Sequence, residues 1–263
     1  MNFEAVFGMS LTQVLIGFTR TSGLMMTAPV FQSRYISAQL KIVFAFALAL
    51  VVAPFIQLHT DLTAMKVWVA VALLIEELLV GLIIGYTIGL TFAALQLGGY
   101  FFDVSIGFGI VNMIDPNSGA EMPLLGQFNY ILSLIVFLAI NGHHTMINAL
   151  IQSFDIIKPG MFFLKKEAVG IILKAFANMF YFGFKIGIPV VGAVFLADVA
   201  LGIISKLIPQ INVFVTGFPI KIFLGLMMIM FFIPVYILLL ERVFANSSDT
   251  FSILRFMMRQ MHQ

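Results

Sequence analysis

Hydrophobic residues along this chain gather into six long blocks separated by short polar stretches. The blocks cover residues 6–30, 42–58, 67–102, 124–152, 169–204 and 213–240. Residues 78–102 carry no charge. A straight helix rises 1.5 Å per residue, so a helix of this length exceeds a hydrocarbon core about 30 Å thick. The pattern therefore predicts a bundle of membrane-crossing helices.

Two of the blocks make weaker spans than the others. The second is short, and the fifth is interrupted by lysines, a proline and an aspartate. Such segments are expected to pack on protein more than on lipid. No fixed repeat and no Gly/Ser-rich linker divides the chain, so we predict a single domain over residues 1–263.

Composition narrows the class of protein. The chain is 61% hydrophobic and 10% charged, and its mean hydropathy is +1.08. A soluble domain has roughly 45–50% apolar and about 25% charged residues, so a soluble enzyme and a disordered scaffold are excluded. A net charge of +2 is too small for a nucleic-acid surface, and without cysteine there is no disulfide framework. The composition predicts an all-α integral membrane protein.

The basic residues indicate an orientation. Six spans with both ends in the cytoplasm would place Lys66, Lys158, Lys165, Lys166, Arg242, Arg255 and Arg259 inside, and Arg34, Lys41 and Lys206 outside. The outer loop at residues 103–123 would hold three acidic residues and no base. By the positive-inside rule, the C-terminus and its basic tail (residues 241–263) are expected in the cytoplasm.

Small residues recur at steps of four in the third block, at Gly81, Gly85, Gly89 and Ala93. This spacing aligns them along one ridge of a helix, where a neighbouring backbone can approach closely. We predict helix packing along this ridge; a functional hinge is the alternative.

Several polar side chains are embedded in apolar sequence. Lys174, Asn178, Tyr181 and Lys185 share one face of a helix. Two interpretations stay open for the embedded charges, namely a hydrophilic path and structural ion pairs between packed segments. The residues that we assign to assembly are Glu76, Lys174, Lys185, Asp198, Lys206, Gln210, Asn212 and Lys221; Glu77 is embedded in the same way.

The sequence lacks the common catalytic motifs. The chain has no His-Glu-x-x-His, no Gly-x-Ser-x-Gly and no phosphate-binding Gly-rich loop. His143 and His144 are adjacent, so on a helix they point about 100° apart and cannot easily share a metal. We therefore expect no enzyme, no catalytic residue, no cofactor and no metal site.

The most unusual stretch is residues 105–123, which begins apolar and Gly-rich and then turns polar at Asp115-Pro116-Asn117. Three interpretations are open. Ser105 to Gly109 is similar to the carbonyl filter of a potassium channel, which would make the protein a homo-oligomeric cation channel. The stretch can also be an ordinary connection, or an apolar gate inside a pore. The residues of the predicted plug are Gly107, Phe108, Gly109, Ile110, Val111, Asn112, Met113, Ile114, Asp115 and Pro116.

These motifs together resemble the FliR family of type III secretion export-gate proteins, which includes injectisome relatives of the SctT type. The resemblance rests on residues 107–127, 141–144, 153–154, 197–206, 209–214 and 217–221. It covers nearly the whole chain in matching order. One departure is Lys206, where the family commonly has Arg nearby.

The resemblance implies more than the composition does. The family's members are non-enzymatic subunits of the export gate in the bacterial inner membrane, at the flagellar basal body. One copy closes an assembly of FliP-like and FliQ-like subunits, next to FlhB-like and FlhA-like proteins. Its helices are bent hairpins stacked into a helical cone, and the loop that matches residues 107–122 plugs the channel. Unfolded flagellar subunits would be exported through it, or virulence proteins in the injectisome alternative.

Overall fold

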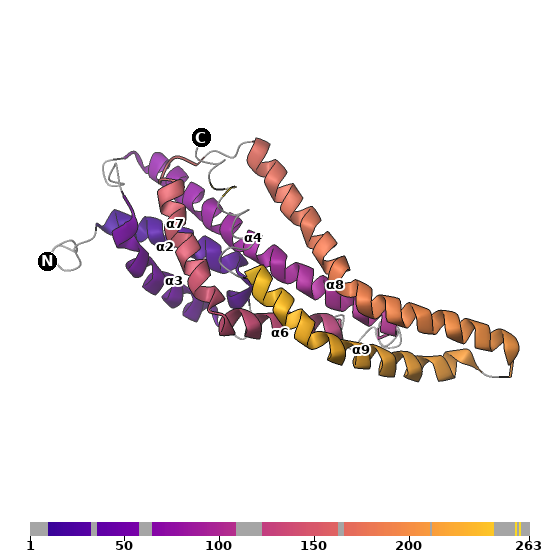
Figure 1. Cartoon of the computed structure of the whole chain (residues 1–263). Helices are drawn as coiled ribbons and strands as arrows, with labels where there is room; N and C mark the ends of the chain where they lie inside the picture. Colours follow the sequence, from indigo (N-terminus) through magenta and orange to yellow (C-terminus); the bar gives the residue numbers. More distant parts are fainter. Residues whose placement is uncertain are drawn as a thin grey trace. The chain divides into compact units, whose positions relative to one another are not determined.

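The computed structural model describes residues 10–32, 36–57, 65–108, 123–162, 166–210, 212–244, 256 and 258. Every regular element within these ranges is helical, which confirms the predicted all-α fold (Figure 1). The long helices are α2 (Leu11–Thr27), α3 (Ala38–Val52), α4 (Val67–Ile106), α6 (Leu124–Ala139), α7 (Gly142–Ile156), α8 (Lys166–Leu207) and α9 (Val213–Phe244). Two short 3-10 turns, η1 (Pro29–Phe31) and η2 (Ala53–Phe55), follow α2 and α3.

Each hydrophobic block corresponds to a helix or to a pair of helices. Within the described ranges, four stretches are long and apolar enough to cross a membrane: Ala38–Phe55, Val67–Ile106, Val169–Leu207 and Val215–Phe244. The bent pair α6 and α7 can supply a fifth span. The fourth block breaks at Asn141, whose φ of 59° is left-handed. Asparagine tolerates that conformation better than most residues do, so one block yields two helices.

The charges and the proline within the fifth block do not end its helix, because α8 continues through Pro189 to Leu207. Proline removes one backbone hydrogen bond from a helix interior. Packing offsets this loss, since Ile186 and Val190 on either side of Pro189 are buried. Gly187, in the same turn, lies against the ring of Phe101 on α4.

The chain divides into two compact units. One unit comprises Met1–Leu90, Asn141–Phe176 and Ala245–Gln263, and the other comprises Thr91–Ile140 and Ala177–Phe244. Helices α4 and α8 each contribute residues to both units. Neither unit is contiguous in sequence, and the single domain over residues 1–263 stays a prediction.

In the first unit, α2 packs lengthwise on α3. Helix α2 begins with a capping box, in which the Ser10 hydroxyl accepts the Gln13 N–H and the Gln13 side chain accepts the Ser10 N–H. The same Gln13 side chain donates to the Ile56 carbonyl oxygen at 3.0 Å. Gly17 faces Ala49 on α3, and both are buried. Small residues at this crossing let the two helices approach closely.

The core of the second unit is aromatic. The Phe92 ring on α4 lies 5.5 Å from the Phe137 ring on α6 and 5.0 Å from the Phe244 ring on α9, between centroids. The same two helices are joined by a buried hydrogen bond, between the hydroxyl groups of Ser133 on α6 and Tyr236 on α9, which are 3.2 Å apart. These contacts fix α4, α6 and α9 against one another within the unit.

Candidate functional site

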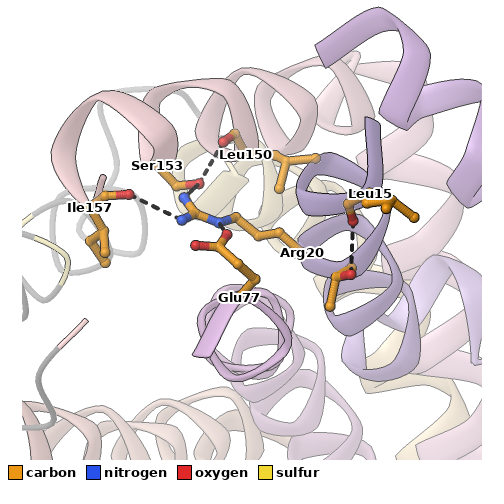
Figure 2. A network of polar contacts seen from close by, with 7 residues as sticks. Leu15, Arg20, Glu77, Leu150, Ser153 and Ile157 are labelled. Atoms are coloured by element: carbon orange, nitrogen blue, oxygen red, sulfur yellow. Dashed lines mark hydrogen bonds and ion pairs between the residues drawn. The ribbon is translucent and has the colours of Figure 1, made fainter. Parts of the chain in front are cut away.

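A buried arginine lies at the centre of the first unit. Arg20 on α2 is 0% exposed, and its Nε donates to Glu77 Oε2 on α4 at 2.6 Å. Figure 2 shows the two terminal nitrogens of the guanidinium, which reach the C-terminal end of α7. One terminal nitrogen donates to Ser153 Oγ and the other to the Ile157 carbonyl oxygen, each at 3.0 Å. Arg20 therefore joins three helices.

The surroundings of Arg20 suit a permanent positive charge. Glu77, 1% exposed, supplies the opposite charge, and the Phe154 ring centroid lies 3.9 Å from the guanidinium carbon. Ile157 is the C-terminal cap of α7, where the helix dipole favours a cation. A carboxylate, a hydroxyl, a carbonyl and a ring face thus satisfy the guanidinium away from solvent. Chemically, the arrangement is a clamp between helices, and its two charged groups are buried from solvent.

The small-residue ridge lies beside this clamp. A Cβ added at Gly81 would meet the backbone of Arg20 and would lie 2.9 Å from Leu24 N. One added at Gly85 would meet the Thr27 hydroxyl and the Leu24 carbonyl oxygen. Thr27 Oγ1 also donates across the crossing to the Leu82 carbonyl oxygen at 3.0 Å. The α2 backbone therefore lies directly on α4, which brings Arg20 next to Glu77.

The rest of the ridge makes looser contacts. A Cβ at Gly89 would be 3.3 Å from the Thr27 carbonyl oxygen, and Ala93 is half-buried in the second unit.

Sequence reasoning did not find the clamp. Arg20 was absent from the predicted sites, and Glu77 was noted without a partner. One signal was available, because Arg20 is the only charged residue in the first hydrophobic block. A charge inside an apolar block is costly unless it is paired.

The second feature is the base of the predicted plug. Helix α4 ends at Ile106, and Gly107 follows with a left-handed φ of 98°. The N–H groups of Gly107 and Phe108 both donate to the Asp103 carbonyl oxygen, at 3.1 and 3.0 Å. Of the predicted plug, only Gly107 and Phe108 are described; Gly109 to Pro116 lie outside the described residues.

Asp103 corrects one expectation from the sequence. It was placed in an outer loop, but it lies in α4 and is 3% exposed. Its carboxylate accepts the Leu125 N–H with both oxygens and the Gly126 N–H with Oδ2, each at 3.0 Å. Leu125 and Gly126 are in the first turn of α6. The acidic residue therefore connects the end of one helix to the start of the next.

The potassium-filter interpretation finds no support in this geometry. Ser105 and Ile106 belong to the last turn of α4, and the Ser105 hydroxyl donates to the Phe102 carbonyl oxygen at 3.1 Å. A carbonyl filter requires backbone oxygens that face an ion, whereas helical carbonyls point along the helix axis.

The residues assigned to assembly lie at several places. Asp198 on α8 and Lys221 on α9 form an ion pair at 2.5 Å. Glu76 is half-buried, and its Oε2 is buried without a hydrogen-bond partner among the described residues. The remaining members are all exposed: Lys174, Lys185, Lys206, Gln210 and Asn212. Asn212 directly precedes α9, and its Oδ1 accepts the Val215 N–H in the first turn at 3.3 Å.

The structure offers no metal centre in the part of the chain that it describes, because no three His, Cys, Asp or Glu side chains gather there. The adjacent rings of His143 and His144 lie 4.3 Å apart between centroids, at the start of α7.

Comparisons with known proteins agree over most of the chain. The family described as "Bacterial export proteins, family 1" matches residues 11–247. The flagellar biosynthetic protein FliR of Bacillus subtilis (strain 168) is 36% identical, over 90% of this chain and 92% of the relative. FliR of Pectobacterium carotovorum is 30% identical over 91% of both chains. FliR of Escherichia coli (strain K12) is 26% identical over 86% of both.

Proposed function

The chain belongs to the FliR family of bacterial export proteins, and we propose that it is a non-enzymatic subunit of the flagellar type III secretion export gate. The observation that carries this proposal is the similarity to flagellar biosynthetic proteins across nine tenths of the chain. These relatives carry flagellar names, which favours the flagellar over the injectisome role. The gate would lie in the bacterial inner membrane, within the flagellar basal body, and pass unfolded flagellar subunits.

The partners are expected to be FliP-like and FliQ-like subunits within the gate, with FlhB-like and FlhA-like proteins beside it. Support comes from the amount of apolar surface that the chain leaves uncovered. Only 17–22% of the most apolar window in each candidate span is buried within the chain. Large side chains such as Leu196 and Phe223 are 68% exposed. Lipid or partner helices must cover such surface, and the polar residues among it favour protein partners.

Within this assembly, residues 107–116 would close the channel. Their sequence supports this role, because glycines at the start permit an unusual backbone and the following Ile110, Val111, Met113 and Ile114 are apolar. A narrow apolar constriction dewets and so resists ions. The flexible side chain of Met113 can re-pack around a passing polypeptide.

Deleting residues 108–112 tests this role. The gate should still assemble with its partners, measured by co-purification, but cells should take up small ions and dyes that wild-type cells exclude. Export of flagellar subunits should persist, because a plug obstructs the channel and does not drive transport. A matched deletion from the tail, residues 259–263, should cause no leak. An assembled gate that stays tight without residues 108–112 would refute the plug.

A further inference from the structure

Lys185 is the lysine of the second unit whose charge nothing in the described part of the chain compensates. Lys221 pairs with Asp198, and Lys206 lies in the last turn of α8, where the helix dipole favours a cation. Lys185 lies in the middle of α8 and is exposed, and no carboxylate of the described residues forms an ion pair with it. Its ammonium group therefore needs a partner from elsewhere.

The backbone at Lys185 has a second polar group that lacks its usual partner within the helix. In an α-helix, the carbonyl oxygen of residue 185 accepts a hydrogen bond from the N–H of residue 189. Residue 189 is a proline, which has no N–H to donate. A donor, the ammonium group, and an acceptor, the carbonyl oxygen, thus lie at the same place on α8.

Lys185 lies on the face of α8 that points away from α4. Gly183 and Gly187, about 200° around the helix from Lys185, pack on α4, where an added Cβ would meet side chains at 2.9 and 3.0 Å. Asn178 and Tyr181 precede Lys185 by seven and four residues, so they share its face, and both are exposed. We call Asn178, Tyr181 and Lys185 the Lys185 face.

Lipid alone does not account for this part of α8. The apolar stretch Val169–Leu207 has 39 residues, which rise about 58 Å as a helix, nearly twice a hydrocarbon core of about 30 Å. Lys185 lies near its middle, and large side chains before and after it are exposed, such as Phe184 at 56% and Phe195 at 63%. If Lys185 lies inside the core, its charge is in hydrocarbon, which is costly. If it lies at a headgroup layer, half of the apolar stretch extends into water. Under either placement, protein has to cover this part of α8.

We propose that the Lys185 face is a docking surface for a membrane-embedded helix of a partner subunit, and that this helix carries a carboxylate. The inference rests on the proposed function, in which FliP-like and FliQ-like subunits assemble with the chain. The carboxylate accepts hydrogen bonds from the Lys185 ammonium group and fixes the register of the two helices. Exposed apolar side chains on either side of the face, Phe182 and Ile188, pack on the partner and exclude water, which strengthens the ion pair.

The test compares three substitutions of Lys185 in the complex that is co-expressed with its partner subunits. Lys185→Arg keeps a positive charge, Lys185→Met keeps only an apolar stem, and Lys185→Glu reverses the charge. We expect wild-type yield of the complex for arginine, a several-fold lower yield for methionine, and no complex for glutamate. All three variants should still reach the membrane, because the Lys185 side chain makes no described hydrogen bond or ion pair within the chain.

A zero-length carbodiimide cross-link on the purified wild-type complex identifies the occupant without any substitution. The reagent activates a carboxylate, and the Lys185 amine displaces the activating group as a urea and forms an amide bond. Peptide mass spectrometry should find Lys185 joined to an Asp or Glu side chain of a partner subunit. The Lys185→Arg complex should assemble but lack this product, because the guanidinium is not a nucleophile under these conditions.

Two control variants separate the position of the charge from its mere presence. Lys41→Met removes a lysine from the first turn of α3, outside the Lys185 face, and should assemble as wild type. Lys185→Met combined with Phe184→Lys keeps the net charge but turns the ammonium group about 100° around the helix. This double variant should not restore assembly.

Several outcomes overturn the inference. They are a wild-type yield for Lys185→Glu, an equal loss of yield for Lys41→Met, and an assembled wild-type complex in which Lys185 is cross-linked to its own chain or to no partner. Phosphatidylglycerol that is bound to the wild-type complex and lost with Lys185→Met would assign the face to lipid, which also rejects the proposal. Failure of the proposed function gives a different result, because the wild-type chain would then not co-purify with FliP-like and FliQ-like subunits at all.

Discussion

Arg20 and Glu77 lie 57 residues apart in the chain and form an ion pair of 2.6 Å whose side chains are 0% and 2% exposed. Neither charge reaches solvent, so each depends on the other for its compensation. The pair joins α2 to α4, and the remaining donors of Arg20 join both to α7 (Figure 2). The arrangement of three helices therefore depends on one guanidinium.

Removing one partner of this ion pair should lower the stability of the protein far more than removing both. Glu77→Leu leaves an uncompensated buried cation, which typically costs about 3–5 kcal/mol. The double variant Arg20→Met with Glu77→Leu replaces the charges by apolar side chains of similar size and should recover much of that stability. The thermal unfolding midpoint of the purified complex, determined for the single and the double variant, measures the two changes in stability. A single variant as stable as wild type would show that the pair contributes nothing.

Gly85→Leu should block assembly by overpacking the α2–α4 crossing. Its side chain would enter space held by the Thr27 hydroxyl and the Leu24 carbonyl oxygen, at a cost on the order of 1–3 kcal/mol or more. The variant should reach the membrane yet fail to co-purify with partner subunits.

Gly192→Leu is the matched control for that experiment, because no described residue of the chain lies within 4 Å of a Cβ at Gly192. Since leucine favours helix over glycine by up to about 1 kcal/mol, this control should be neutral or slightly stabilising for the chain. Normal complex yield and motility with Gly85→Leu would argue against the predicted packing ridge.

Expression without partners should yield an unstable protein. Within the described residues, the apolar faces of the spans stay exposed and the buried Oε2 of Glu76 has no hydrogen-bond partner. We expect partner subunits to cover these groups. Alone, the chain should aggregate or be degraded, whereas co-expression with FliP-like and FliQ-like subunits should give one complex on size exclusion. A monodisperse homo-oligomer without partners would contradict this and favour a channel.

We expect the C-terminus to lie in the cytoplasm. A reporter that works only in the cytoplasm should therefore be active when fused after Gln263, and one that works only in the periplasm should be inactive. The basic residues Arg242, Arg255 and Arg259 near that end are the reason, by the positive-inside rule. Paired fusions to a cytoplasm-active and a periplasm-active reporter give the measurement. Strong periplasmic activity would reverse the predicted orientation.

Much of the helical architecture could be predicted because a membrane span is local in sequence. Hydrophobicity summed over about 20 residues is sufficient to recognise a span, and the blocks at 67–102 and 213–240 correspond to α4 and α9. The break at Asn141 also had a local signal in Asn141-Gly142, and the steps of four at Gly81 and Gly85 identified a ridge of small residues.

The pairing of charges was decided only by the tertiary structure. Whether Glu76 or Glu77 faces α2 depends on the rotation of α4 and on where the two helices cross, and both are set by contacts distant in sequence. Glu77 thus meets Arg20, whereas the adjacent Glu76 points about 100° away. Asp103 illustrates the same limit. Its charge directly after the apolar block 67–102 suggested a loop, but the N–H groups of Leu125 and Gly126 stabilise it inside a helix. No local pattern contains a partner more than twenty residues away, because such a partner is brought close only when the helices pack.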